Sequence, residues 1–143
     1  MQQVGGTEPS GFVRVEAQVE PSVQLGELRQ FVTDAVALLG LGASDDVAVL
    51  THELVKNALA LDERTIRVSV QRRPPDGLRV EVRDHGYGLP VLDHAAGLDG
   101  GLGLRLVDRL ADRWGVDQFL PGKIVWFELE PRAVRPPAGA EPR

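Results

Sequence analysis

The chain has 143 residues, of which 43% are hydrophobic, so its length and composition fit a single domain with a sizeable core. Its formal net charge of −5 gives no general basic footprint for direct nucleic-acid binding. Cysteine is absent, which excludes disulfides and thiolate metal sites and agrees with a reducing compartment. The sequence has neither a signal-peptide pattern nor an apolar run of the ~20 residues that span a bilayer. We therefore expect a cytoplasmic protein without membrane contact.

The first half of the chain predicts one strand and two helices after a flexible leader over residues 1–11. Apolar and polar residues alternate over residues 13–19, which predicts a strand with one buried face. A helix follows, with Ser22 as its N-cap and Gly40 at its end. Ser44 is the expected cap of the second helix. The apolar stripe of that helix consists of Val47, Leu50, Leu54, Ala58 and Leu61.

The second half of the chain predicts strands on both sides of a third helix. Alternation over residues 66–70 and 78–82 predicts two strands, joined by a turn at residues 74–77. The glycine-rich residues 85–101 lack periodicity and predict a long loop. A helix is expected from about Leu102 to Trp114.

The C-terminal part predicts a closing hairpin, with strands over residues 116–120 and 124–129. Residues 131–143 are rich in proline and alanine and are expected to be a disordered tail, so that the folded domain covers residues 12–130. Helices and paired strands in separate runs indicate an α+β fold. We expect a two-layer sandwich in which helices cover one face of an antiparallel or mixed sheet.

Glu53 and Asn57 form the first candidate site. They lie four residues apart on the second predicted helix, so their side chains point the same way. A carboxylate at position 53 can orient or deprotonate a hydroxyl group or a water molecule. The amide oxygen of Asn57 can bind a hard cation such as magnesium. The alternative is an ordinary solvated helix face, because Glu and Asn are common on helices.

Asp84 forms the second candidate site, at the point where an apolar strand ends and a glycine-containing segment begins. A carboxylate held there can accept a hydrogen bond from the amino group of adenine. Gly86 and Gly88 lack side chains that would block the approach of a flat ring. The alternative is a plain turn, which Asp and Gly after a strand commonly form.

Gly100, Gly101 and Gly103 form the third candidate site, directly before the third predicted helix. Glycine backbone at a helix N-terminus offers free N–H groups and a favourable dipole to phosphates. The pattern is neither a P-loop nor a dinucleotide-binding fingerprint. The alternative is a flexible loop in which the glycines allow the chain to turn.

The three motifs occur in the order and spacing of the N, G1 and G2 boxes of the GHKL ATPase superfamily, which the chain resembles from about Phe12 to Leu129. Within that superfamily it is similar to the RsbW-like anti-sigma-factor serine kinases of the actinobacterial ATP-binding type. Residues 106–115 and 122–129 also resemble the G2 helix and the last strand of those regulators. The resemblance implies a Bergerat fold with a mixed sheet, and a mobile lid over residues 89–100.

The resemblance also implies residue roles, with ATP and magnesium as cofactors. Glu53 would be the general base and Asn57 the magnesium ligand. Asp84 would bind adenine. The remaining nucleotide contacts would fall on four glycines, with Gly86 and Gly88 beside adenine and Gly101 and Gly103 at the phosphates.

Members of this family bind a sigma factor and phosphorylate a serine of a STAS-type antagonist, and they commonly form homodimers. The resemblance therefore implies an anti-sigma-factor serine kinase. Three departures remove polar nucleotide contacts that relatives often have: Ala60 and Leu102 replace basic residues, and Ile124 replaces a threonine. Because of these departures, a second interpretation stays open: the chain is a GHKL-fold protein-binding module with weak or no catalysis. A third interpretation is a structural domain that binds no nucleotide.

Overall fold

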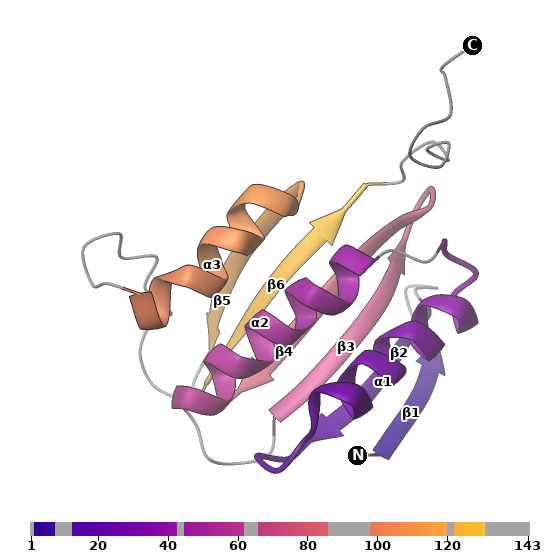
Figure 1. The fold of residues 1–143 in the computed structure, drawn as a ribbon. Coiled ribbons are helices and arrows are strands. Elements are labelled where there is room, and N and C mark those ends of the chain that lie inside the picture. Colours follow the sequence, from indigo (N-terminus) through magenta and orange to yellow (C-terminus); the bar gives the residue numbers. More distant parts are fainter. Residues whose placement is uncertain are drawn as a thin grey trace.

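Six strands and three helices make up the part of the chain that the structure describes (Figure 1). The computed structural model describes residues 2–7, 13–42, 45–61, 66–85, 98–119 and 122–130. In chain order the elements are β1 (Gln2–Thr7), β2 (Val13–Val19), α1 (Leu25–Leu38), α2 (Asp45–Leu61), β3 (Ile66–Arg73), β4 (Gly77–Asp84), α3 (Leu98–Leu110), β5 (Arg113–Phe119) and β6 (Gly122–Leu129). The predicted α+β class is confirmed.

The strands form one sheet in the order β1-β2-β3-β4-β6-β5. All five neighbouring pairs are antiparallel. The expectation of a mixed sheet is therefore wrong for the described strands, and the antiparallel alternative holds. The physical reason is the position of β6. Strands β4 and β5 run in the same direction, but β6 returns between them and pairs with both.

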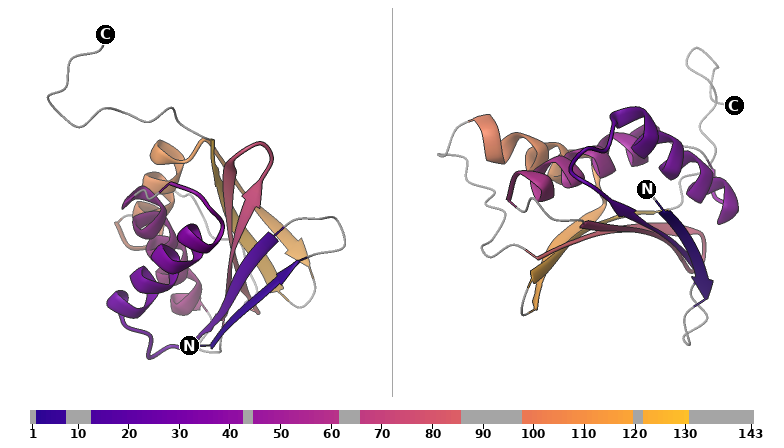
Figure 2. Two further views of the ribbon diagram at one scale, coloured as in Figure 1. Left: turned by 90° about the vertical axis from the view of Figure 1, so that its right-hand side faces the viewer. Right: turned by 90° about the horizontal axis from the view of Figure 1, so that it is seen from below.

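The three helices lie on one face of the sheet, as predicted (Figure 2). Helix α2 occupies the middle of the helical layer and contacts α1, α3, β3 and β4. The opposite face of the sheet carries no helix among the described residues (Figure 2). Among the described residues, a ligand between the two layers would meet the helices and the helix-facing side of the strands.

The core fills the space between the helices and the sheet. The buried residues of α1 recur with the period of a helix face: Leu28, Phe31, Val32, Ala35 and Val36. Alternate strand residues point to the same face of a sheet. In strands β3, β4 and β6, alternate residues on one face are buried under the helices: Val68, Val70, Val80, Val82, Val125 and Phe127. Helices α2 and α3 contribute Leu50, Leu54, Leu104 and Val107.

The N-terminal segment differs from its prediction. The expected flexible leader is wrong for Gln2–Thr7, which forms edge strand β1 and pairs with β2. Strand pairing needs only backbone N–H and C=O groups, so a polar segment with two glycines can form a strand without apolar alternation. Residues 8–12 lie outside the described part of the chain.

Helix α1 begins later than predicted and ends as predicted. Its N-cap is Gln24 rather than Ser22. Gly40 has a φ of +70°, in the left-handed region that glycine adopts without strain. The Leu41 N–H donates to the Val36 carbonyl at 3.0 Å, which is the Schellman arrangement that ends many helices.

Helix α3 begins and ends four residues earlier than predicted. The predicted loop over residues 85–101 is wrong for residues 98–101, which are helical, and Trp114 belongs to β5. Glycine weakens a helix by about 1 kcal/mol relative to alanine. Burial of Leu104 and Val107 offsets that cost, because tertiary packing contributes more to helix stability than local propensity does.

Several predictions lie outside the described residues. They concern the cap at Ser44, the lid over residues 89–97 and the tail over residues 131–143. The last three residues of the predicted lid, 98–100, are the first residues of α3. In the described part of the chain, no helix has both the length and the apolar character needed to cross a membrane.

Candidate functional site

A small cavity lies between helices α2 and α3 and strands β4 and β6. Its volume is about 10 Å³, which is room for about one water molecule. Its apolar wall consists of Leu54 and Ala58 from α2, Leu104 from α3 and Val125 from β6. Three polar residues complete the lining: Asn57, Asp84 and Lys123. The site therefore has a hydrophobic wall and a polar end.

Asp84 and Lys123 form a buried ion pair at the polar end of the cavity. Asp84 is the last residue of β4, and Lys123 lies directly opposite it on β6. The Lys123 Nζ atom donates to Asp84 Oδ1 at 3.0 Å, and the two side chains are 2% and 0% exposed. Removing two charges from water is costly, so each group depends on the other for compensation.

Asn57 places an amide group at the same cavity. Its Nδ2 atom is buried and has no hydrogen-bond partner within the described part of the chain. Leaving a buried donor without a partner costs roughly 1–3 kcal/mol. Native structures rarely leave such a group unsatisfied unless a water molecule or a ligand completes it. The amide of Asn57 is therefore available to a small polar group.

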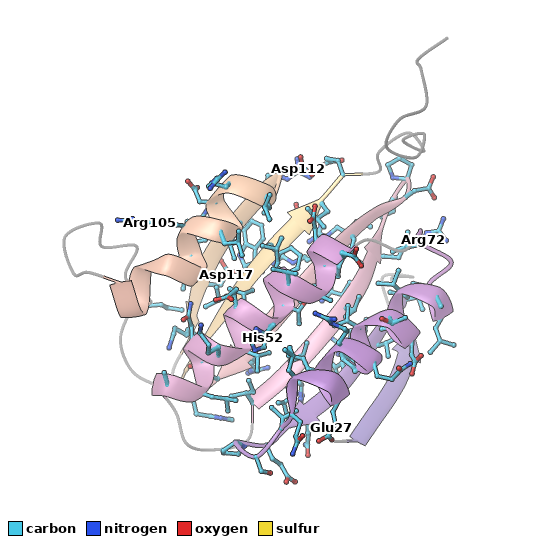
Figure 3. All side chains as sticks on the ribbon, viewed as in Figure 1. Glu27, His52, Arg72, Arg105, Asp112 and Asp117 are labelled. Carbon is cyan, nitrogen blue, oxygen red and sulfur yellow. The ribbon has the colours of Figure 1, made fainter. Side chains whose placement is uncertain are left out.

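Glu53 lies one helical turn before Asn57 but does not line the cavity. Its side chain is 18% exposed. Lys56 Nζ lies 3.5 Å from Glu53 Oε2, and His52 Nδ1 lies 3.9 Å from Glu53 Oε1. Figure 3 shows His52 on α2 and Arg105 on the neighbouring helix α3. A partly exposed carboxylate in this place can reach a group outside the cavity.

Comparison with known protein families matches residues 42–133 to the Histidine kinase-, DNA gyrase B-, and HSP90-like ATPase family. The chain belongs to this family. The match includes α2, the β3–β4 pair, α3 and the C-terminal strand pair, so the cavity lies entirely within it. The family contains the GHKL ATPases, and the predicted superfamily is thereby confirmed. A search of curated proteins finds no match to the chain.

The fold of this GHKL family member brings two of the predicted ligand-binding residues, Asn57 and Asp84, to the wall of one cavity. Glu53 is their neighbour on α2. Gly86 and Gly88 lie outside the described residues, so their place beside adenine stays a prediction.

The third motif lies inside α3 rather than before it. Because α3 begins at Leu98, Gly101 and Gly103 are its fourth and sixth residues. Only the first four N–H groups of a helix lack an intrahelical partner. The N–H of Gly103 therefore belongs to the helical ladder, and a phosphate contact there would require α3 to begin later. The phosphate-binding roles of both glycines stay predictions.

Lys123 is the site residue that the sequence analysis missed. A signal was present, because Lys123 shares the alternation of Val125 and Phe127 and must point to the same face of β6. The same alternation places Ile124 on the opposite face, so the interpretation of Ile124 as a lost nucleotide contact is wrong. Ala60 is exposed on α2, and the side chain of Leu102 lies outside the described residues.

The donor set of the site fits magnesium only together with phosphate. Within the described residues, no group of three or more His, Asp or Glu side chains is arranged to hold a metal ion. Asn57 lines the cavity, and its side chain has a single amide oxygen. Magnesium in phosphate-binding enzymes commonly takes one or two protein ligands and completes its shell with phosphate oxygens and water. The single amide oxygen of Asn57 is compatible with that kind of coordination.

Proposed function

We propose that this GHKL ATPase binds ATP with magnesium, phosphorylates a serine of a STAS-type antagonist and sequesters a sigma factor. Asp84 would accept a hydrogen bond from the adenine amino group, and Asn57 would be the magnesium ligand. The observation that carries the proposal is the meeting of Asn57 and Asp84, which are distant in sequence, at one cavity of an ATPase-family domain.

The position of Glu53 supports the transfer step of the proposal. As general base, its carboxylate would take the proton of the serine hydroxyl as the hydroxyl oxygen becomes the nucleophile. Glu53 is partly exposed and lies one turn from Asn57, so a protein substrate can approach it from outside.

A second candidate function is a protein-binding module that retains the GHKL fold with weak or no catalysis. The ion pair between Lys123 and Asp84 favours it, because Lys123 already holds one oxygen of the carboxylate that would meet adenine. In this alternative the helices and the sheet would hold a partner protein, and nucleotide would have little influence on that contact.

Heat denaturation with and without MgATP tests nucleotide binding. A ligand that binds only the folded state stabilises it by roughly 2.7 kcal/mol at a hundredfold excess over Kd. We expect millimolar MgATP to raise the melting temperature and ATP without magnesium to raise it less. An unchanged melting temperature would exclude the ATP-binding function.

Transfer of labelled γ-phosphate to a panel of purified STAS-type proteins tests the kinase activity separately. We expect one serine of one panel member to be labelled, and replacement of that serine by alanine to abolish the label. MgATP binding without transfer to any panel member would favour the protein-binding module.

A further inference from the structure

Lys123 is a buried cation at the candidate site for which the proposed function supplies no role. We propose that Lys123 occupies the base site of the unliganded protein, and that a purine nucleotide binds by displacing its ammonium group from Asp84. This inference rests on the proposed function, because it concerns the same cavity and the same ligand. It makes Lys123 the residue that sets nucleotide affinity.

The hydrogen bond between the two residues is the first argument. The ammonium group lies 3.0 Å from Asp84 Oδ1, which is the distance of a normal N–H···O hydrogen bond. An exocyclic amino group of a purine is also an N–H donor and would seek the same carboxylate. The lysine ammonium is charged and the purine amino group is neutral, and charge-assisted hydrogen bonds are roughly twice as strong as neutral ones. A base that binds at Asp84 Oδ1 therefore competes with a stronger donor.

The size of the cavity is the second argument. Among the described residues the cavity has room for about one water molecule, so a purine ring that enters between these side chains needs one of them to move. Leu54, Ala58, Leu104 and Val125 are apolar members of the core and lose burial if they move into water. Lys123 is different, because its flexible stem can carry the ammonium group to solvent, where it regains hydration. Moving Lys123 makes room and frees the acceptor in one step.

Replacement of Lys123 by serine tests the proposal in the full chain. Lys123→Ser shortens the side chain and keeps a hydroxyl donor near Asp84. We expect isothermal titration calorimetry to show a Kd for MgATP at least tenfold lower in Lys123→Ser than in the parent. Arg29→Ser is the matched control, because it removes one positive charge from an exposed position on α1. Its Kd should equal that of the parent.

The outcomes separate the two hypotheses. If the parent binds MgATP and Lys123→Ser binds it equally or more weakly, Lys123 does not compete with the base, and only this inference is overturned. If neither protein binds MgATP at millimolar concentration, the proposed ATP-binding function fails and the inference falls with it. Binding by Lys123→Ser alone would support the inference in its strongest form.

A second measurement uses the parent protein and does not depend on the folding of a variant. The chain contains two lysines, Lys56 and Lys123, so selective ¹⁵N-lysine labelling gives two side-chain ammonium groups. The Lys56 side chain is 58% exposed and its protons should exchange too fast to be seen, whereas the buried Lys123 ammonium should give a resolved signal. We expect saturating MgATP to shift or abolish that signal. An unchanged Lys123 signal at saturation would overturn the proposal.

Discussion

Gly122 lies so close to the end of β4 that a Cβ atom on it would fall 2.1 Å from the carbonyl oxygen of Asp84. Contacts of Cβ atoms below 3.0 Å essentially never occur, and the obstacle here is backbone rather than a flexible side chain. Glycine at position 122 therefore allows β6 to approach β4 directly before Lys123. The close approach of Gly122 to Asp84 therefore lies next to the ion pair between Lys123 and Asp84.

We predict that Gly122→Ala destabilises the protein by about 1–3 kcal/mol, the usual cost of inserting a methyl group where there is no room. Urea denaturation measures this cost as a lower midpoint. Gly26→Ala is the matched control, because a Cβ there meets nothing within 4 Å and the position is helical. It should stabilise the protein by about 0.5–1 kcal/mol. Equal midpoints for the two variants would contradict the close approach.

The ion pair at the cavity predicts a strong coupling between Asp84 and Lys123. Asp84→Asn leaves a buried ammonium group without its counter-charge, and breaking such a pair costs about 3–5 kcal/mol. Replacing both partners, as Asp84→Asn with Lys123→Met, removes both charges and should recover most of that loss. A double-mutant cycle by urea denaturation measures the coupling. Additive effects of the two single changes would show that the pair contributes little.

Glu53 is predicted to act in chemistry more than in binding. Glu53→Ala should reduce phosphoryl transfer about 10²–10⁴-fold, the usual range for a lost general base, and should leave the Kd for MgATP within a few fold. Lys56→Ala is the control, because it removes the nearest ion-pair partner of Glu53 and keeps the carboxylate. Single-turnover transfer to the proposed STAS-type substrate measures both variants. Transfer by Glu53→Ala at the parental rate would exclude the general-base role.

Glu128 connects three arginines on the face of the sheet opposite the helices. Arg113 Nε donates to its carboxylate at 2.8 Å and Arg79 Nη1 donates at 3.0 Å, while Arg73 Nε lies 3.3 Å away. Burial by itself raises the pKa of Glu128. The hydrogen bonds from Arg113 and Arg79 and the charge of Arg73 outweigh burial and hold this pKa below its ordinary value of 4.5.

A lowered pKa in the folded state predicts a pH-dependent contribution to stability. The contribution of Glu128 is fully present above about pH 4.5, the ordinary value, and is lost as the pH falls through the lowered pKa of the folded protein. Glu128→Gln should therefore lower the free energy of unfolding by about 1–3 kcal/mol at pH 7, with the difference from the parent shrinking in acid. Urea denaturation from pH 7 to pH 3 measures it, with the exposed Glu20→Gln as control. A difference that stays constant with pH would contradict this account.

Sequence patterns were sufficient where local chemistry decides the structure. Alternation predicted the buried faces of β3 and β4, and Gly40 predicted the end of α1, because each depends on a few neighbouring residues. Sequence patterns failed where tertiary packing overrides the local conformational preference of the residues. Glycines 100, 101 and 103 indicated a loop, yet they lie in α3, whose C-terminal part is held by Leu104 and Val107. The polar residues of β1 gave no signal, because its pairing with β2 is a backbone interaction.

The sequence by itself determined the α+β class, the ATPase family and two residues of the cavity, Asn57 and Asp84. It could do so because these features are carried by short motifs and by the periods of helices and strands. Only the tertiary structure decided that Lys123 pairs with Asp84 and that Ile124 points away from the site. That pairing depends on the register between β4 and β6, which lie far apart in the chain and are aligned only by the packing of the sheet under α2 and α3.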